Sequence, residues 1–191
     1  MTPASLEFRF AEPADRPGLA ALLLALDRHY WGPRDGAPAM AEAAADALLG
    51  DAADALLGDA ADALLGDASG CRALLAFVDG APAGLATVTV LHPGLDAAGT
   101  LFLKDLYVDE AARGLGLGAR FMRRLARHAA ELGCRRFDWT AETDNPRALA
   151  FYDALGAARV PEKVWYRFAG EDLARLAAEP QDGAAAAGEA P

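Results

Sequence analysis

Cysteine is scarce in this chain of 191 residues, and long apolar runs are missing. Cys71 and Cys134 do not make a disulfide framework and lack the spacing of metal ligands, so we expect two reduced, buried thiols and no metal site. No apolar run reaches the ~20 residues that a membrane-spanning helix needs. Residues 1–10 contain no basic region followed by an apolar stretch, which argues against a signal peptide. We therefore expect a cytoplasmic protein without a membrane partner.

The chain also has fewer basic than acidic residues. The sequence has 18 Lys and Arg against 28 Asp and Glu, a formal net charge of −10, which argues against nucleic acid as a partner. Residues 108–136 depart from this balance, because they contain seven arginines and three acidic residues. Hydrophobic residues make up 53% of the chain, as is typical of a soluble globular domain. We expect one domain over residues 1–179, followed by a disordered tail, 180–191, rich in Ala, Gly and Pro.

Hydrophobic periodicity and turn residues predict a mixed α/β order of elements. Asp15 is placed to cap the first helix, Asp79-Gly80 has the composition of a hairpin turn, and Gly133 is placed to end a long helix. The order comprises a hairpin, one βαβ unit and a further strand. We expect strands at Leu6–Phe10, Arg72–Val78, Ala83–Leu91, Leu101–Val108, Phe137–Ala141 and Val164–Phe168, and helices from Asp15 to His29, from Pro38 onward, and at Gly116–Leu132, Asn145–Leu155 and Glu171–Ala178.

An eight-residue sequence, ADALLGDA, occurs three times without change, at 45–52, 53–60 and 61–68. Perfect octads are not typical of solenoids, whose units are longer and diverge, so local duplication within the gene is the simpler account. Ala and Leu favour a helix, while each glycine weakens it by about 1 kcal/mol. We expect a helix about 24 Å longer than one copy of the octad would require, with the glycines as the points where it can break. We expect no function that depends on the repeat.

The sequence RGLGLG, residues 113–118, follows an expected strand and opens an expected helix. Glycines let the backbone approach a ligand and turn without a Cβ penalty. The first N–H groups of a helix and its dipole favour an anion at that point, and an arginine adds a forked cation suited to phosphate. The segment therefore predicts a cradle for a pyrophosphate.

Three known kinds of glycine-rich motif are possible explanations for such a cradle. A P-loop needs Lys and Ser or Thr after the glycines, where this chain has Ala119-Arg120. A dinucleotide fingerprint is matched by Gly114, Gly116 and Ala119, with Asp138 further along. In that fingerprint, however, the glycines form the first tight turn after the strand, whereas residues 109–113 intervene here.

The third interpretation rests on resemblance. Residues 103–119, LKDLYVDEAARGLGLGA, resemble the acetyl-CoA motif of the GNAT acetyltransferase superfamily, R/Q-x-x-G-x-G/A. Residues 145–157, NPRALAFYDALGA, resemble the second block of that family, and the chain is most similar to diamine and polyamine acetyltransferases. The resemblance covers Leu6 to about Ala178. It implies an α/β GNAT fold, with a mostly antiparallel, splayed sheet and helices on both faces, and it makes the octads, about 45–68, an insertion.

The resemblance implies a cofactor, acetyl-CoA, and the residues that bind it. Backbone groups of one strand would bind the pantetheine arm, the glycine turn would hold the pyrophosphate, and two residues of the second block would line the thiol end. The implied cofactor-binding residues are Leu106, Tyr107, Val108, Arg113, Gly114, Leu115, Gly116, Leu117, Gly118, Ala119, Asn145 and Ala148. We expect Leu117, Phe121 and Leu125 to face the sheet and Arg120, Arg123, Arg124 and Arg127 to face outward.

The resemblance also implies the catalytic groups. Tyr152 is the expected general acid, since a phenol can donate a proton to a thiolate of similar basicity. A lysine-like amine is neutral in about one molecule in a few thousand at pH 7, so a base is needed, and Asp105 is our candidate. Diamine and polyamine acetyltransferases tend to have a glutamate where this chain has Lys104. We expect Lys104 on the opposite face of the strand from Asp105, solvated or in a salt bridge. The candidate acceptor-binding residues are His29, Tyr30, Asp105, Glu162 and Trp165.

The expected activity is therefore transfer of acetyl from acetyl-CoA to a primary amine of a small molecule, by a homodimer. The acceptor is a diamine, a polyamine or an amino-acid-like amine. Two alternatives stay open: acetylation of a protein N-terminus or lysine, and a coenzyme A-binding module without catalysis.

Overall fold

The protein is described by a computed structural model that covers residues 4–49, 70–92 and 98–178. It divides into two units, residues 1–149 and 150–191. Only the first five residues of the octads belong to the described part, so the expectation of a lengthened or broken helix lies outside the described residues. The tail expected at 180–191 lies outside them as well.

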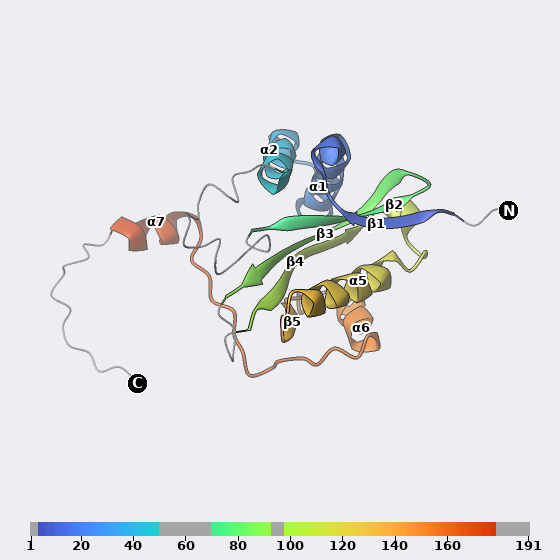
Figure 1. The fold of residues 1–191 in the computed structure, drawn as a ribbon. Coiled ribbons are helices and arrows are strands. Elements are labelled where there is room, and N and C mark those ends of the chain that lie inside the picture. Colours follow the sequence, from blue (N-terminus) through green and yellow to red (C-terminus); the bar gives the residue numbers. More distant parts are fainter. Residues whose placement is uncertain (1–3, 50–69, 93–97, 179–191) are drawn as a thin grey trace, which may run out of the picture. The chain divides into compact units, whose positions relative to one another are not determined.

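The first unit is built on a five-stranded sheet in the order β1-β2-β3-β4-β5 (Figure 1). Its first four strands are antiparallel neighbours, and β5 runs parallel to β4, so the predicted mixed, mostly antiparallel sheet is confirmed. Asp79 and Gly80 both have positive φ, 50° and 81°, and turn β2 into β3 as their composition predicts. The strands are β1 (Leu6–Phe10), β2 (Arg72–Val78), β3 (Ala81–Leu91), β4 (Thr100–Val108) and β5 (Arg136–Trp139).

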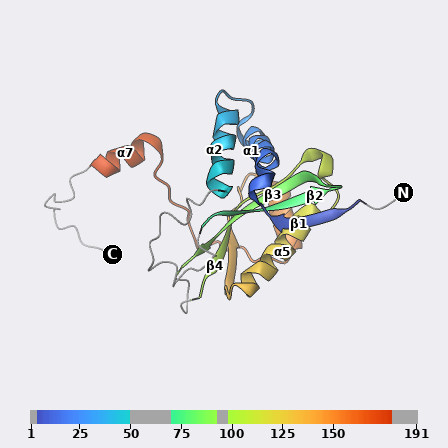
Figure 2. The same ribbon diagram turned by 45° about the horizontal axis from the view of Figure 1, so that its top comes forward.

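Helices cover both faces of this sheet, as the family resemblance implies. Helices α1 (Arg16–Trp31) and α2 (Ala37–Leu49) lie on one face, and α5 (Leu117–Glu131) lies on the other (Figures 1 and 2). On α5, Leu117, Phe121 and Leu125 are fully buried, which confirms the face predicted from their four-residue spacing. The buried residues of α1 and α2 also recur at helical spacing: Leu19, Leu22 and Leu26, and Ala37, Ala41 and Ala45.

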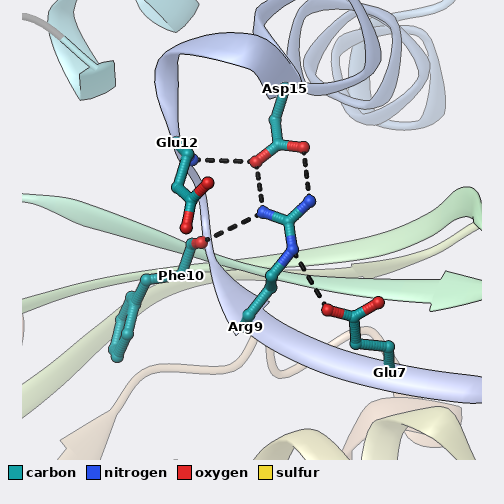
Figure 3. Close-up of polar contacts among 5 residues, drawn as sticks. All are labelled: Glu7, Arg9, Phe10, Glu12 and Asp15. Atoms are coloured by element: carbon teal, nitrogen blue, oxygen red, sulfur yellow. Dashed lines mark hydrogen bonds and ion pairs between the residues drawn. The ribbon is translucent and has the colours of Figure 1, made fainter.

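Arg9 ties β1 to the start of α1 (Figure 3). Its guanidinium donates to both carboxylate oxygens of Asp15, one of them at 2.8 Å, and this hydrogen bonding lowers the pKa of Asp15. Asp15 also accepts from the backbone N–H of Glu12, the N-cap of the short helix η1 (Pro13–Asp15), at 2.8 Å. Asp15 occupies the N-cap position of α1, as the sequence predicts, but its side chain makes no capping hydrogen bond to that helix. Its carboxylate is bound by Arg9 and by the N–H of Glu12 instead.

The sheet opens between β4 and β5. Their pairing runs from Thr100↔Arg136 to Leu103↔Trp139 and stops there. β5 ends at Trp139, two residues earlier than the sequence pattern predicts, so β4 continues past it for five residues. In the described part of the chain, the backbone of β4 from Lys104 onward has no strand beside it on the β5 side. This opening is the splay that the family resemblance implies.

Helix α6 (Pro146–Ala154) crosses from the first unit into the second, and α7 (Gly170–Ala178) follows. The strand predicted at Val164–Phe168 is wrong, because this segment has no regular structure. Its β-branched and aromatic residues favour a strand only when a neighbouring strand completes the hydrogen bonds. All five of these residues are exposed instead, for example Tyr166 at 86%.

Two searches of the described residues bear on the class of protein. No helix among them combines the length and the hydropathy that a membrane crossing requires. No group of three or more His, Cys, Asp or Glu side chains gathers in residues 4–49, 70–92 and 98–178 in a way that would hold a metal ion. Cys71 and Cys134 are free thiols there, each half-buried, and burial raises the pKa of both.

Candidate active site

The glycine turn lies where the sequence predicts it, between β4 and α5. A short helix, η4 (Glu110–Ala112), follows β4, and its N-cap Asp109 accepts from the N–H of Ala111 at 2.9 Å. Gly114 and Gly116 then take φ values of 86° and 71°, a region that residues with a Cβ atom rarely adopt. A Cβ atom built on either glycine meets nothing within 4 Å, so the space above the turn is open.

The N-terminus of α5 offers unpartnered donors to that space. No side chain among the described residues caps it, and the backbone N–H of Arg120 makes a helical hydrogen bond to the carbonyl of Gly116 at 3.2 Å. The N–H groups of Leu117, Gly118 and Ala119 therefore begin the helix without intrahelical acceptors. Together with the helix dipole, these groups form a site that favours an anion, and a pyrophosphate is such an anion. The turn thus fits the group that the motif predicts.

Arg113 is held in place by its own loop. Its Nη1 donates to Glu110 at 2.9 Å, and its Nε donates to the carbonyl oxygen of Val108 at 3.4 Å. Its side chain is 30% exposed, so part of the guanidinium remains open to solvent. The arginine therefore links the end of β4 to the glycine turn and keeps a positive charge beside the N-terminus of α5.

A groove of about 790 Å³ runs along the exposed side of α5. It begins at Leu115 and Gly116, is bounded by Phe8 of β1, and continues past the outward-facing arginines of α5. We call it the arginine groove. No carboxylate of the described residues forms an ion pair with these arginines, so the groove attracts anions. Its four arginines are Arg120, Arg123, Arg124 and Arg127.

The last residues of β4 combine burial on one side with a free backbone edge on the other. Tyr107 is 7% exposed and packs in the core with α1, and burial raises the pKa of its phenol. Leu106 and Val108 are half-buried. Since no described strand lies beside this edge, an amide-rich chain can add to it as a further strand would. The role of Leu106, Tyr107 and Val108 in binding the pantetheine arm remains a prediction, and this open edge is compatible with it.

Asp105 and Lys104 meet at an irregularity of β4. The register passes from Thr87↔Asp105 to Val88↔Leu103, so Lys104 is the additional residue of a β-bulge. The expectation that Lys104 points away from Asp105 is wrong, because a bulge interrupts the alternation of side chains along a strand. Lys104 Nζ donates to Asp105 Oδ2 at 2.9 Å, so Lys104 does form a salt bridge, as expected. Thr87 Oγ1 donates to the same oxygen at 2.6 Å.

Tyr30, at the end of α1, is close enough to Asp105 for the charge of that carboxylate to affect its pKa. Burial raises the pKa of the Tyr30 phenol, the charges of Asp105 and Glu142 raise it further, and the charge of Lys104 opposes them. Tyr30 is 56% exposed, and its ring lies edge-on to His29 with centroids 5.5 Å apart. The structure thus brings together Tyr30, His29 and Asp105, three of the five candidate acceptor residues.

The remaining candidates belong to the second family block or follow it. Asn145 Oδ1 accepts from the N–H of Ala148 at 3.0 Å, so the pair forms the cap of α6. Tyr152 lies near the end of α6, with its ring centroid 5.0 Å from that of Phe151. Tyr152, Glu162 and Trp165 belong to the second unit, and their assigned roles remain predictions.

Sequence reasoning missed two residues of this site, Thr87 and Glu142. Thr87 is 2% exposed and donates to Asp105, although the two residues are far apart in the sequence. The signal was a hydroxyl in the middle of an apolar strand, where a buried polar group needs a partner. Glu142 gave no comparable signal, since it is one exposed carboxylate among many.

A family model supplies the decisive comparison. The model of the acetyltransferase (GNAT) family matches residues 37–157, which is more than half of the chain. The chain belongs to this family. The resemblance predicted from the glycine turn and the second block is thereby confirmed, and so is the cofactor of the family, acetyl-CoA.

Three known proteins are similar to this chain. It is 35% identical over 80 residues to a thialysine N-epsilon-acetyltransferase of Bos taurus, covering 40% of this chain and 47% of that protein. It is 33% identical over 82 residues to a spermidine/spermine N(1)-acetyltransferase-like protein 1 of Homo sapiens, and this match covers 41% of this chain and 12% of that protein. A solved integron cassette protein from the mobile metagenome of V. cholerae is 33% identical, with a TM-score of 0.73, covering 91% of this chain and 98% of that one. The matches thus span about half the length of the first relative and a small part of the second.

Proposed function

We propose that this GNAT protein transfers an acetyl group from acetyl-CoA to a primary amine of a small molecule. The observation that carries the proposal is the opening between β4 and β5 beside the uncapped N-terminus of α5, with Asp105 on the same strand. The named relatives act on thialysine or resemble spermidine/spermine acetyltransferases, which supports an amine acceptor for this chain.

The donor half of the site is formed by backbone groups. The N–H groups of residues 117–119 and the charge of Arg113 bind the pyrophosphate, and the free edge of Leu106–Val108 binds the pantetheine amides. When bound, acetyl-CoA supplies a thioester whose carbonyl carbon is attacked by the amine. A backbone N–H of the open edge is suited to stabilise the developing negative charge on the carbonyl oxygen.

Two side chains move protons in this proposal. Asp105 takes a proton from the acceptor ammonium, directly or through water, because only the neutral amine is a nucleophile. The new nitrogen–carbon bond forms as the carbon–sulfur bond breaks, and Tyr152 donates a proton to the departing sulfur. The ammonium loses two protons in one turnover: one ends on the thiol of coenzyme A, and the other reaches solvent.

Thiol release tests the proposal directly. Purified protein, acetyl-CoA and a panel of diamines, amino acids and aminoglycosides should yield coenzyme A and an acetylated amine of matching mass with at least one acceptor class. Thermal stabilisation by acetyl-CoA, compared with NAD, checks the cofactor independently. Stabilisation by NAD alone, or acetyl-CoA binding without turnover on any amine, would contradict the proposal.

Tyr152 has a matched control within the second unit. Tyr152→Phe should lower kcat by about a hundredfold, the usual contribution of a general acid, and leave the Kd for acetyl-CoA unchanged. Tyr166→Phe makes the same chemical change at a side chain that is 86% exposed and should keep full turnover. If Tyr152→Phe also keeps full turnover, the general-acid assignment is wrong.

The homodimer and the cytoplasmic location are further proposals. Analytical sedimentation of the purified protein tests the homodimer.

A further inference from the structure

Lys104 places a positive charge next to the carboxylate that is proposed to receive the acceptor amine. Its Nζ lies 2.9 Å from Asp105 Oδ2, and the same oxygen accepts from Thr87. An acceptor that carries only positive charge would meet an ammonium already at this position. In the described part of the chain, Asp105 Oδ1 accepts no hydrogen bond, so one carboxylate oxygen remains for an incoming amine.

The two side chains differ in their exposure. The Asp105 side chain is 20% exposed, while that of Lys104 is 67% exposed. The carboxylate is therefore held in place by Thr87 and the strand, whereas the ammonium ends a flexible stem that reaches solvent. The geometry presents a fixed negative group and, beside it, a movable positive group at the surface. An incoming molecule with an amine and a carboxylate can pair with both.

The charges around Tyr30 support this pairing. Its phenol is influenced by two negative groups, Asp105 and Glu142, and one positive group, Lys104, which leaves one net negative charge. A diamine carries two positive charges at neutral pH, whereas a diamino acid carries two positive charges and one negative charge. The diamino acid therefore matches the site in the number and in the sign of its charges.

We infer that Lys104 is a specificity-determining residue that selects acceptors with a carboxylate as well as an amine, and that diamino acids are preferred over diamines. The acceptor amine pairs with Asp105, and the acceptor carboxylate pairs with Lys104. This inference rests on the proposed acetyltransferase function and names the acceptor class of the same site.

Two pairs of acceptors differ by one carboxylate and nothing else: lysine and cadaverine, and ornithine and putrescine. For the unaltered protein, kcat/KM should be at least about tenfold higher for the amino acid of each pair, the effect of one charge-assisted hydrogen bond. Lys104→Gln should remove this preference, Lys104→Glu should reverse it, and Lys104→Arg should preserve it. The Kd for acetyl-CoA should be the same in all four proteins.

The outcomes separate this inference from the proposed function. Turnover in which diamines equal or exceed their amino acids overturns the inference and leaves the acetyltransferase intact. If Lys104→Gln lowers kcat/KM equally for both acceptors of a pair, Lys104 acts on catalysis or folding, and this result also overturns the inference. If no amine turns over, the proposed function fails. Calorimetric titration of lysine and cadaverine into the protein with coenzyme A then decides the inference, because tighter binding of lysine supports it and equal or weaker binding contradicts it.

Discussion

Gly84 of β3 and Tyr107 of β4 lie so close that a Cβ atom on Gly84 would stand 2.8 Å from the carbonyl oxygen of Tyr107. The same atom would lie 3.1 Å from Cε2 of Phe121, which is fully buried on α5. Backbone on one side and a packed ring on the other leave no room for a methyl group. The approach of β3 to β4 thus fixes the strand whose free edge is proposed to bind the pantetheine arm.

Gly84→Ala should therefore lower both stability and cofactor affinity. We expect a loss of about 1–3 kcal/mol in the free energy of unfolding, the usual cost of overpacking a core, measured by urea denaturation. The Kd for acetyl-CoA should rise because Tyr107 is displaced. Gly80→Ala is the control: its φ of 81° makes alanine unfavourable, but nothing lies within 4 Å of the new Cβ. Gly80→Ala should lose stability and keep its affinity for acetyl-CoA. Equal Kd values for acetyl-CoA in Gly84→Ala and Gly80→Ala would contradict the prediction.

Asp105 and Thr87 should contribute to turnover and not to cofactor binding. Asp105→Asn removes the proposed base and should lower kcat/KM by about a hundredfold. Thr87→Val keeps the shape of the side chain and removes the hydroxyl that donates to Asp105 at 2.6 Å, so we expect a loss of about tenfold. Thr89→Val makes the same change two residues further along the strand and should leave kcat/KM unchanged. A Thr87→Val protein with full activity would mean that the strand alone positions Asp105.

The backbone features of the proposed donor site could be predicted from the sequence because their signals are local. Positive φ at Gly114 and Gly116, the start of α5, and the buried face of that helix all follow from residues close together in the chain. The hairpin at Asp79-Gly80 was predicted for the same reason. Each of these features is decided by the conformational freedom of glycine or by the helical period.

The acceptor half could not be predicted in the same way. The expectation for Lys104 assumed a regular strand, and the β-bulge depends on how β3 and β4 pair, which the sequence of one strand does not reveal. The hydrogen bond from Thr87 to Asp105 likewise joins two strands. The segment Val164–Phe168 has strand propensity and forms no strand, because propensity does not supply a partner.

His128 should make the stability of the protein depend on pH near neutrality. Burial lowers the pKa of its imidazole below the usual 6.5, the charges of Arg72 and Arg124 act in the same direction, and Glu131 opposes them. Below about pH 6.5 the unfolded chain therefore binds a proton that the folded chain does not. The free energy of unfolding should fall as the pH falls from 7.5 to 5.5.

Two variants isolate this effect. His128→Gln cannot titrate in this range and should flatten the dependence of the unfolding free energy on pH. Glu131→Gln removes the carboxylate that lies 3.6 Å from His128 Nδ1 and favours protonation, so the dependence should become steeper. Urea denaturation at several pH values measures both. An unchanged slope in His128→Gln would show that other groups cause the dependence.

The arginine groove should distinguish coenzyme A from its dephosphorylated form. The groove begins at Gly116, beside the proposed pyrophosphate site, and its arginines have no carboxylate partners among the described residues. We expect Arg120, in the first turn of α5, to contact the remaining phosphate of coenzyme A. Arg120→Gln should then raise the Kd for coenzyme A by about tenfold and leave the Kd for dephospho-coenzyme A unchanged. Arg127 belongs to the same groove but lies about 10 Å further along the helix, so Arg127→Gln should have a smaller effect. Calorimetry with both ligands measures this, and equal losses for the two ligands would show that Arg120 acts through the general field of the groove.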